Sequence, residues 1–135
     1  MKHIAVVYWS GTGNTEAMAQ AVAEGAQATL YAAEDFTPDL AAACDAVALG
    51  CPAMGAEVLE EEIFQPMFDA CKPALAGKPA VLFGSYGWGD GEWIRAWADD
   101  CAAAGIPLAA EPLMCQDAPD NDALEACRAL GAALL

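Results

Sequence analysis

Basic residues are scarce in this sequence. Five lysines and arginines stand against 20 aspartates and glutamates in 135 residues, which gives a formal net charge of −15. A surface this acidic repels nucleic-acid phosphates and anionic lipid headgroups, so neither nucleic acid nor a membrane is expected as a partner. The excess charge favours docking by basic proteins, or it serves only to keep the protein in solution. Composition leaves both interpretations open.

Histidine and closely spaced cysteines are also missing. The single histidine, His3, lies near the N-terminus, and no two of the six cysteines have the C-x-x-C spacing. Zinc, iron–sulfur and thioredoxin-type sites are therefore not expected, and no metal site is predicted. We expect the cysteines to be reduced and mostly buried, as small apolar residues. They are Cys44, Cys51, Cys71, Cys101, Cys115 and Cys127.

Long hydrophobic runs are the third absence. No run approaches the ~20 apolar residues that a membrane-spanning helix needs, and residues 1–9 lack the layout of a signal peptide. We therefore expect a soluble, cytoplasmic protein. Hydrophobic residues nevertheless make up 57% of the chain, well above the level of disordered sequences. The length predicts a single domain over residues 1–135.

Short apolar runs alternate with alanine-rich amphipathic segments along the whole chain. The expected strands are His3–Trp9, Ala28–Ala32, Asp45–Cys51, Lys78–Ser85 and Ile106–Leu113, and the expected helices are Asn14–Gln27, Glu60–Leu75, Asp90–Gly105 and Pro119–Leu134. Pro66 favours a later start for the second helix, and the residues from Ala32 through Pro38 are expected to form a polar connection. The apolar runs at 4–9, 46–51 and 80–85 do not alternate with polar residues, which predicts strands buried on both faces. The fold class is therefore α/β, a three-layer doubly wound sandwich whose ligand site lies at the carboxyl ends of the strands.

The loop after the first predicted strand has the composition of a phosphate site. Glycines let the backbone approach an anion, and the following helix start contributes free N–H groups and a positive dipole end. The loop has neither the lysine of a nucleotide-triphosphate loop nor the third glycine of the dinucleotide fingerprint. This composition favours a single phosphate monoester, with a simple capped polar turn as the alternative. The loop residues are Ser10, Gly11, Thr12, Gly13, Asn14 and Thr15.

Two more unusual loops follow the third and fourth predicted strands. The first is CPAMGAE (51–57), and the second is SYGWGDG (85–91), which pairs two aromatics with three glycines. In the second loop, glycine N–H groups can face a flat ligand while Trp88 stacks on it. Trp93 and Trp97 lie four residues apart on one helix face, which favours a place in the core over a ligand platform.

Together the three loops resemble those of the flavodoxin family, which carries [ST]-x-T-G-N-T, GC-x-AMG-x-E and GSYGWGDG at these places. The resemblance extends over nearly the whole chain and implies a five-stranded parallel sheet in the order 2-1-3-4-5. It implies non-covalently bound FMN and a role as an electron-transfer protein, not an enzyme. The implied cofactor-binding residues are Ser10, Gly11, Thr12, Gly13, Asn14, Thr15, Pro52, Ala53, Met54, Gly55, Ala56, Glu57, Ser85, Tyr86, Gly87, Trp88, Gly89 and Asp90.

The resemblance also implies individual roles in tuning the flavin. Trp88 would stack on one face of the ring system, Met54 would cover the other, and the backbone of residues 87–89 would bind the pyrimidine edge. Glu57 would accept a hydrogen bond from flavin N3–H, although a solvated charge that continues Glu60, Glu61 and Glu62 is the alternative. The Gly55 carbonyl would turn towards flavin N5–H in the one-electron-reduced state.

Two residues depart from the family pattern. Pro52 stands where close relatives carry a serine hydroxyl near the phosphate, so we expect that contact to be lost and the loop to be stiffer. Ala56 replaces the acidic or small polar residue that often follows the glycine. The loss of that polar or charged group beside the ring is expected to alter the redox potentials.

The expected function is a low-potential one-electron carrier that shuttles mainly between the FMN semiquinone and hydroquinone. Basic-surfaced redox proteins are expected to dock transiently on an acidic rim near the flavin, on a monomeric carrier. The rim candidates are Glu57, Glu60, Glu61, Glu62, Asp90 and Glu92.

Three other functions fit the fold class less well. An FMN-dependent NAD(P)H or quinone reductase is the main alternative, although no added segment or basic cluster offers a second-substrate site. A phospho-accepting receiver domain needs an acidic pair after the first strand and an aspartate at the end of the third, where Trp9-Ser10 and Cys51-Pro52 stand instead. A low-molecular-weight phosphatase needs a Cys-x5-Arg loop, which this sequence lacks.

Overall fold

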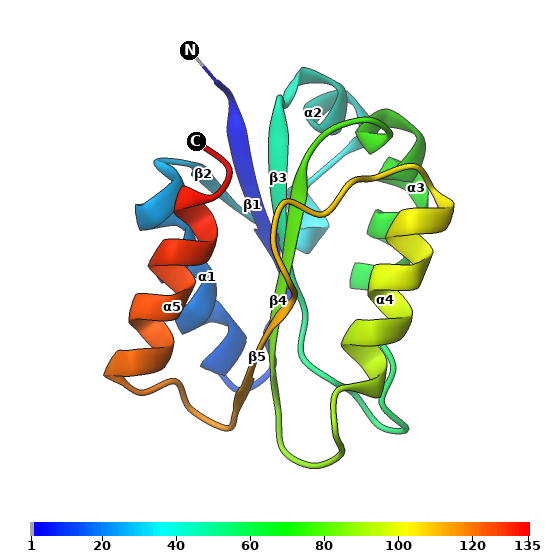
Figure 1. Ribbon diagram of the computed structural model, residues 1–135. Coiled ribbons are helices and arrows are strands. Elements are labelled where there is room, and N and C mark those ends of the chain that lie inside the picture. The colour runs from blue at the N-terminus through cyan, green and yellow to red at the C-terminus, as the bar shows by residue number, and fades with distance from the viewer. Residues whose placement is uncertain (1) are drawn as a thin grey trace.

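A parallel sheet lies between two helical layers in the computed structural model, which describes residues 2–135 (Figure 1). The strands are β1 (Ile4–Tyr8), β2 (Thr29–Ala32), β3 (Ala46–Gly50), β4 (Ala80–Tyr86) and β5 (Leu113–Gln116). They are ordered β2-β1-β3-β4-β5, and every neighbouring pair is parallel. The strand order expected from the sequence is confirmed. Its winding reverses between β1 and β3, where such sheets bind their ligands.

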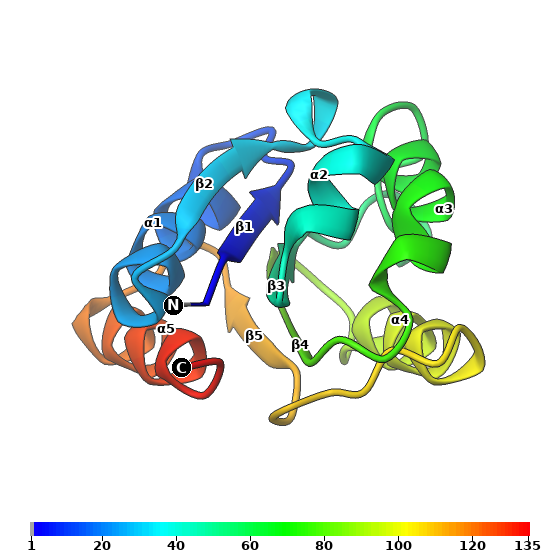
Figure 2. The same ribbon diagram turned by 90° about the horizontal axis from the view of Figure 1, so that it is seen from above.

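The helices cover both faces of the sheet. Helices α1 (Asn14–Ala26) and α5 (Asn121–Ala132) pack on one face, and α2 (Pro38–Ala43), α3 (Phe64–Leu75) and α4 (Glu92–Ala103) lie on the other (Figure 2). Successive strand residues point to opposite faces, so Val6 and Ala48 join the core beneath α1 and α5 while Val7 and Leu49 join the core beneath the other helices. Strand β3 is buried along its whole length, as its continuous apolar run predicts.

The position predicted for the fifth strand is wrong. Residues 106–113 were expected to form it, but only Leu108 makes an isolated bridge, to Ala80, and the strand proper is Leu113–Gln116 beside Phe83–Tyr86. Between the isolated bridge and the strand pairing, this segment contains two more residues than β4 does, so the extra residues bulge out of the sheet. Pro107 and Pro112 lack the N–H that a continuous ladder needs, which explains the break.

Two helices also differ from expectation. The segment expected to be a polar connection contains a short 3-10 helix (Ala33–Asp35) followed by α2, whose first residue is Pro38 and whose N-cap Thr37 accepts a hydrogen bond from Leu40 N–H (3.3 Å). Proline at the first helical position after a threonine cap is a helix start signal. Helix α3 begins at Phe64, so Pro66 lies in its first turn, as expected.

The expectations for tryptophan and cysteine burial are confirmed. Trp93 and Trp97 are buried, and five of the six cysteines are buried as free thiols, with Cys115 half-buried. Trp93 also holds α4 against the end of β3, because its Nε1–H donates to the Cys51 carbonyl (3.1 Å). None of the helices within residues 2–135 has the length and apolar character needed to cross a membrane.

Candidate cofactor-binding site

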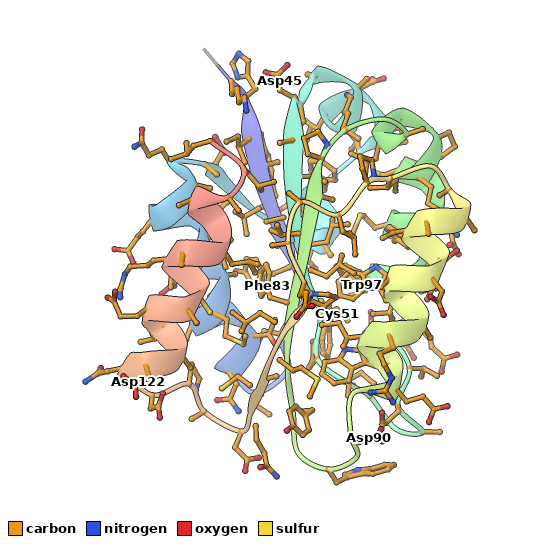
Figure 3. All side chains as sticks on the ribbon, viewed as in Figure 1. Asp45, Cys51, Phe83, Asp90, Trp97 and Asp122 are labelled. Atoms are coloured by element: carbon orange, nitrogen blue, oxygen red, sulfur yellow. The ribbon has the colours of Figure 1, made fainter. Side chains whose placement is uncertain are left out.

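The carboxyl ends of β1, β3 and β4 meet at one edge of the sheet, and a cleft of about 240 Å³ opens there. This edge carries Asp90 at the lower end of the view in Figure 3, opposite Asp45 at the other end of the sheet. All three loops singled out in the sequence contribute to the cleft. Its lining residues are Trp9, Gly11, Thr12, Asn14, Pro52, Ala53, Met54, Ser85, Tyr86, Gly87 and Asp117.

A chain of hydrogen bonds holds the loops at this edge together. Thr15, only 1% exposed, accepts a hydrogen bond at Oγ1 from the Ser85 N–H (3.3 Å). The Ser85 hydroxyl in turn donates to the Asp117 carbonyl (2.7 Å). Helix α1, β4 and the loop after β5 are therefore fixed relative to one another. The structure places Thr15 beneath the phosphate loop as an internal link.

The start of α1 has the geometry of an anion site. Its N-cap, Gly13, has a φ of 95°, which favours glycine, and offers no capping side chain of its own. Ser10 Oγ instead accepts from the Gly13 N–H (3.0 Å) within the loop. Thr12 and Asn14 line the cleft, so the positive end of the α1 dipole lies beside it. A phosphate monoester fits these neutral donors without a lysine or arginine.

The loop after β3 forms a tight turn at the rim of the cleft. Met54 and Val58 exchange backbone hydrogen bonds of 2.8 and 3.0 Å, which close a turn through residues 55–57. Met54 lines the cleft together with Pro52 and Ala53, whereas Gly55 and Ala56 are exposed at the tip of the turn.

Glu57 joins this turn to the loop after β4. Its carboxylate accepts hydrogen bonds from the backbone N–H groups of Asp90 (3.2 Å) and Trp93 (3.3 Å), and so caps the start of α4 from outside the helix. A Cβ at Gly89 would overlap Glu57 Oε1, so glycine there leaves the room that this contact needs. Glu57 is therefore not a freely solvated charge, and it lies outside the lining of the cleft.

The loop after β4 divides between the cleft and the surface. Tyr86 and Gly87 line the cleft, whereas Trp88 is 66% exposed. Arg95 holds Asp90 at the surface, because its Nη1 donates to the Asp90 carbonyl (2.8 Å) and its Nη2 to Asp90 Oδ1 (3.0 Å). Nine of the sequence-predicted site residues line the cleft, and the other nine surround it or support it. These other nine are Ser10, Gly13, Thr15, Gly55, Ala56, Glu57, Trp88, Gly89 and Asp90.

Sequence reasoning missed two lining residues, Trp9 and Asp117. Trp9 was counted as the end of the first strand, although a residue directly after a strand end is a candidate by the rule that placed the other loops. Asp117 follows β5, and the same rule applied to the correct strand would have found it. Its φ of 58° and its N–H, which donates to the Tyr86 carbonyl (2.8 Å), fix this loop against β4.

Glu60 was expected on an acidic rim, and the structure corrects this. The side chain is buried, with the residue 7% exposed, and its carboxylate accepts from the backbone N–H groups of Glu62 (2.9 Å), Ile63 (2.7 Å) and Phe64 (2.7 Å). Burial alone would raise the pKa of Glu60, but these three donors outweigh it and hold the pKa below its ordinary value. Glu60 therefore caps α3 and presents no charge to a partner.

The sheet order, the start of α1 and the cleft beside it define a flavodoxin-like α/β protein with a site for a phosphorylated flat ligand. The sequence profile of the flavodoxin family matches residues 6–131. The chain belongs to the flavodoxin family, so it is an FMN-binding electron carrier. The donor set described above fits this cofactor, since the neutral groups at the start of α1 would hold the phosphate, and Trp9, Met54 and Tyr86 of the cleft lining would flank the flat ring.

Individual relatives agree over nearly full length. The chain is 44% identical over 135 residues to a flavodoxin of Megasphaera elsdenii, with 96% of each chain covered, and 41% identical over 121 residues to one of Clostridium beijerinckii, with 86% and 88% covered. The solution structure of two-electron reduced Megasphaera elsdenii flavodoxin superimposes with a TM-score of 0.88 at 40% identity over 97% of each chain. A flavodoxin from the domain Archaea superimposes with a TM-score of 0.89 at 25% identity, covering 98% of this chain and 95% of the other.

Proposed function

We propose that the protein is a low-potential one-electron carrier whose FMN shuttles mainly between semiquinone and hydroquinone. The observation that carries this proposal is the turn at Gly55. Gly55 is exposed, has a φ of 49°, and has no atom other than its own and those of its two chain neighbours within 4 Å of the place where a Cβ would lie. Its peptide therefore has room to reorient, and its carbonyl would accept a hydrogen bond from flavin N5–H. That bond would favour the one-electron-reduced, protonated flavin.

Acidic groups around the cleft would disfavour the last reduction step, which leaves an anionic flavin. Glu57, Asp90 and Glu92 belong to the loops at this edge. Two like charges ~4 Å apart near a protein surface repel by about 4 kcal/mol, and the repulsion weakens with distance and salt. Arg95 offsets part of the Asp90 charge. In this proposal Trp88 stacks on the exposed flavin face and Met54 covers the other.

Stepwise reduction tests this mechanism. We expect a reductive titration of the FMN-loaded protein to accumulate a large fraction of neutral semiquinone before the hydroquinone forms. The variant Gly55→Val should lower that fraction, because a β-branched side chain strongly disfavours a positive φ and restricts the peptide. A single two-electron step in the unsubstituted protein would refute the proposal.

The docking surface in this proposal is an acidic rim made of Glu61, Glu62, Asp90 and Glu92, all exposed. Glu57 and Glu60 leave the set because their carboxylates cap helices. The basic side chains of the molecule are occupied internally: Lys2 and Lys78 donate to backbone carbonyls, and Lys72, Arg95 and Arg128 pair with carboxylates. Arg95 offsets part of the Asp90 charge on this rim, so Glu61, Glu62 and Glu92 supply most of the attraction for a basic partner.

Ionic strength tests the docking proposal. Electron transfer to a basic redox protein, for example a cationic cytochrome, should slow as salt rises, because screening weakens charge-guided encounter. The double variant Glu61→Gln/Glu62→Gln should reduce both the rate and its salt dependence. Asp45→Asn removes a single acidic charge at the far end of the sheet (Figure 3); it is the control for charge lost outside the rim and should change neither. A rate independent of salt would contradict charge-guided docking.

A reductase is the second candidate function, and no feature of the cleft favours it over a carrier. Direct oxidation of NADH or NADPH by the purified FMN-loaded protein would establish it. We further propose that the carrier is monomeric and works in the cytoplasm. Support for the compartment comes from the cysteines, which are all free thiols, as a reducing environment predicts.

A further inference from the structure

Glu16 occupies a position from which it could compete with the FMN phosphate. It is the third residue of α1, and a glutamate at the third helical position commonly folds back to accept a hydrogen bond from the N-cap N–H. At most helices this contact is stabilising. At α1 it would bring a carboxylate to the N–H groups that the phosphate needs, and it would place a negative charge beside a ligand of the same sign.

The structure diverts Glu16 from this contact. The hydroxyl of Tyr8 donates to Glu16 Oε2 (3.2 Å), and the N-cap Gly13 directs its own N–H to Ser10 Oγ (3.0 Å). Gly13 itself has no side chain to cap α1, and the first helical N–H, that of Asn14, donates a long hydrogen bond to Thr12 Oγ1 (3.5 Å). The Glu16 carboxylate is therefore bound to β1 and not to the helix start.

Tyr8 is well placed to hold a carboxylate. It is the last residue of β1, paired with Ala32 on one side and Gly50 on the other, and its ring packs against the core beneath α1 and α5. Partial burial raises the pKa of Tyr8, and the nearby Glu16 and Glu34 carboxylates raise it further. The hydroxyl thus keeps its proton near neutral pH and acts as a donor.

We propose that Tyr8 is a positioning residue for phosphate recognition: by binding the Glu16 carboxylate, it holds that negative charge away from the N-terminus of α1, where the FMN phosphate would bind. Tyr8 itself is not among the residues that line the cleft. The inference rests on FMN binding at this loop, but it concerns only the phosphate part of that binding. FMN and riboflavin differ by this phosphate alone, so the ratio of their dissociation constants isolates the effect.

The experiment measures both dissociation constants by quenching of flavin fluorescence. Tyr8→Phe should weaken FMN binding about fivefold, the size of a typical helix-cap competition, while riboflavin binding stays within about twofold. Adding Glu16→Gln to Tyr8→Phe should restore FMN binding, because the neutral amide no longer competes as an anion. Tyr31→Phe is the matched control, because Tyr31 lies on the neighbouring strand β2 and packs on Phe36 (ring centroids 5.4 Å apart). It should change neither constant.

A second variant tests the same idea with Tyr8 intact. Glu16→Asp shortens the side chain so that it no longer reaches the Tyr8 hydroxyl but still lies beside the helix start, and it should also weaken FMN binding relative to riboflavin. An equal loss of FMN and riboflavin affinity in Tyr8→Phe would overturn the proposal, as would a failure of Glu16→Gln to restore FMN binding. If the unsubstituted protein bound FMN no better than riboflavin, the phosphate site itself would be refuted.

Discussion

Replacing Glu60 by glutamine removes the buried carboxylate that caps α3 while nearly preserving its shape. In the native protein Oε1 accepts from Ile63 and Phe64 N–H (2.7 Å each), and Oε2 accepts from Glu62 N–H (2.9 Å). A glutamine keeps one oxygen for the first two donors. Its amide nitrogen then faces the Glu62 N–H, so that a donor meets a donor.

The expected destabilisation follows from these contacts. One hydrogen bond to a charged acceptor is lost, which is worth about 1.5–3 kcal/mol, and the favourable charge at the helix N-terminus disappears as well, worth about 0.3–1 kcal/mol. The lower desolvation cost of a neutral amide offsets part of this loss. We therefore expect Glu60→Gln to lower the free energy of unfolding by about 2 kcal/mol, a large share of a typical domain's stability.

The loss should also depend on pH. The pKa of Glu60 is lower in the folded protein than its ordinary value, so the ionised carboxylate stabilises the fold above its unfolded pKa. This stabilisation is lost as the pH falls through the folded pKa. The difference between the native protein and Glu60→Gln should therefore be full at pH 7 and shrink as the pH falls below the usual glutamate pKa of about 4.3.

Urea unfolding followed by tryptophan fluorescence, at a fixed saturating FMN concentration, measures this difference. Glu61→Gln is the matched control, because its side chain is exposed one residue away and should change stability by less than about 0.5 kcal/mol. Equal small effects of the two substitutions would refute the capping role of Glu60. A difference that did not shrink in acid would refute the pKa argument.

Two other predictions concern packing and thiol chemistry. Gly25→Ala should destabilise the protein by about 2 kcal/mol or more, because the new Cβ would collide with the Arg128 carbonyl where α1 packs on α5. Gln20→Ala, on the exposed face of α1, is the control and should be nearly neutral in the same unfolding assay. A thiol reagent should modify at most Cys115 in the native protein and all six cysteines after unfolding. The five thiols other than that of Cys115 are buried, and burial raises the pKa of Cys51 and Cys101 to about 12. Rapid modification of several native thiols would contradict the observed burial.

Local pattern was enough to predict most of the architecture. Apolar runs without polar alternation placed the three central strands, β1, β3 and β4, because a strand buried on both faces needs apolar residues on both sides. The same reasoning misplaced the fifth strand. Ile106–Leu113 and Leu113–Gln116 are both short apolar segments, and only pairing with Phe83–Tyr86 of β4 decides between them.

The candidate site was likewise predictable from the sequence only in part. Glycines, hydroxyls and aromatics in the loops at 10–15, 51–57 and 85–91 were visible in the sequence because those residue types have few structural uses in such density. Burial of Glu60 and capping of α4 by Glu57 were not visible, since a carboxylate has the same sequence signature whether it faces solvent or a helix start.

The sequence by itself therefore determined the fold class, the three ligand-binding loops and the acidic character of the molecule, all of which depend on residue type and short-range spacing, and the resemblance of those loops to flavodoxins implied FMN. Only the tertiary structure decided what each charged or hydroxyl group binds. Thr15 links to Ser85 across 70 positions, and Tyr8 turns Glu16 away from the helix that contains it. Such contacts depend on which elements the sheet brings side by side, and that arrangement arises from packing of the whole chain.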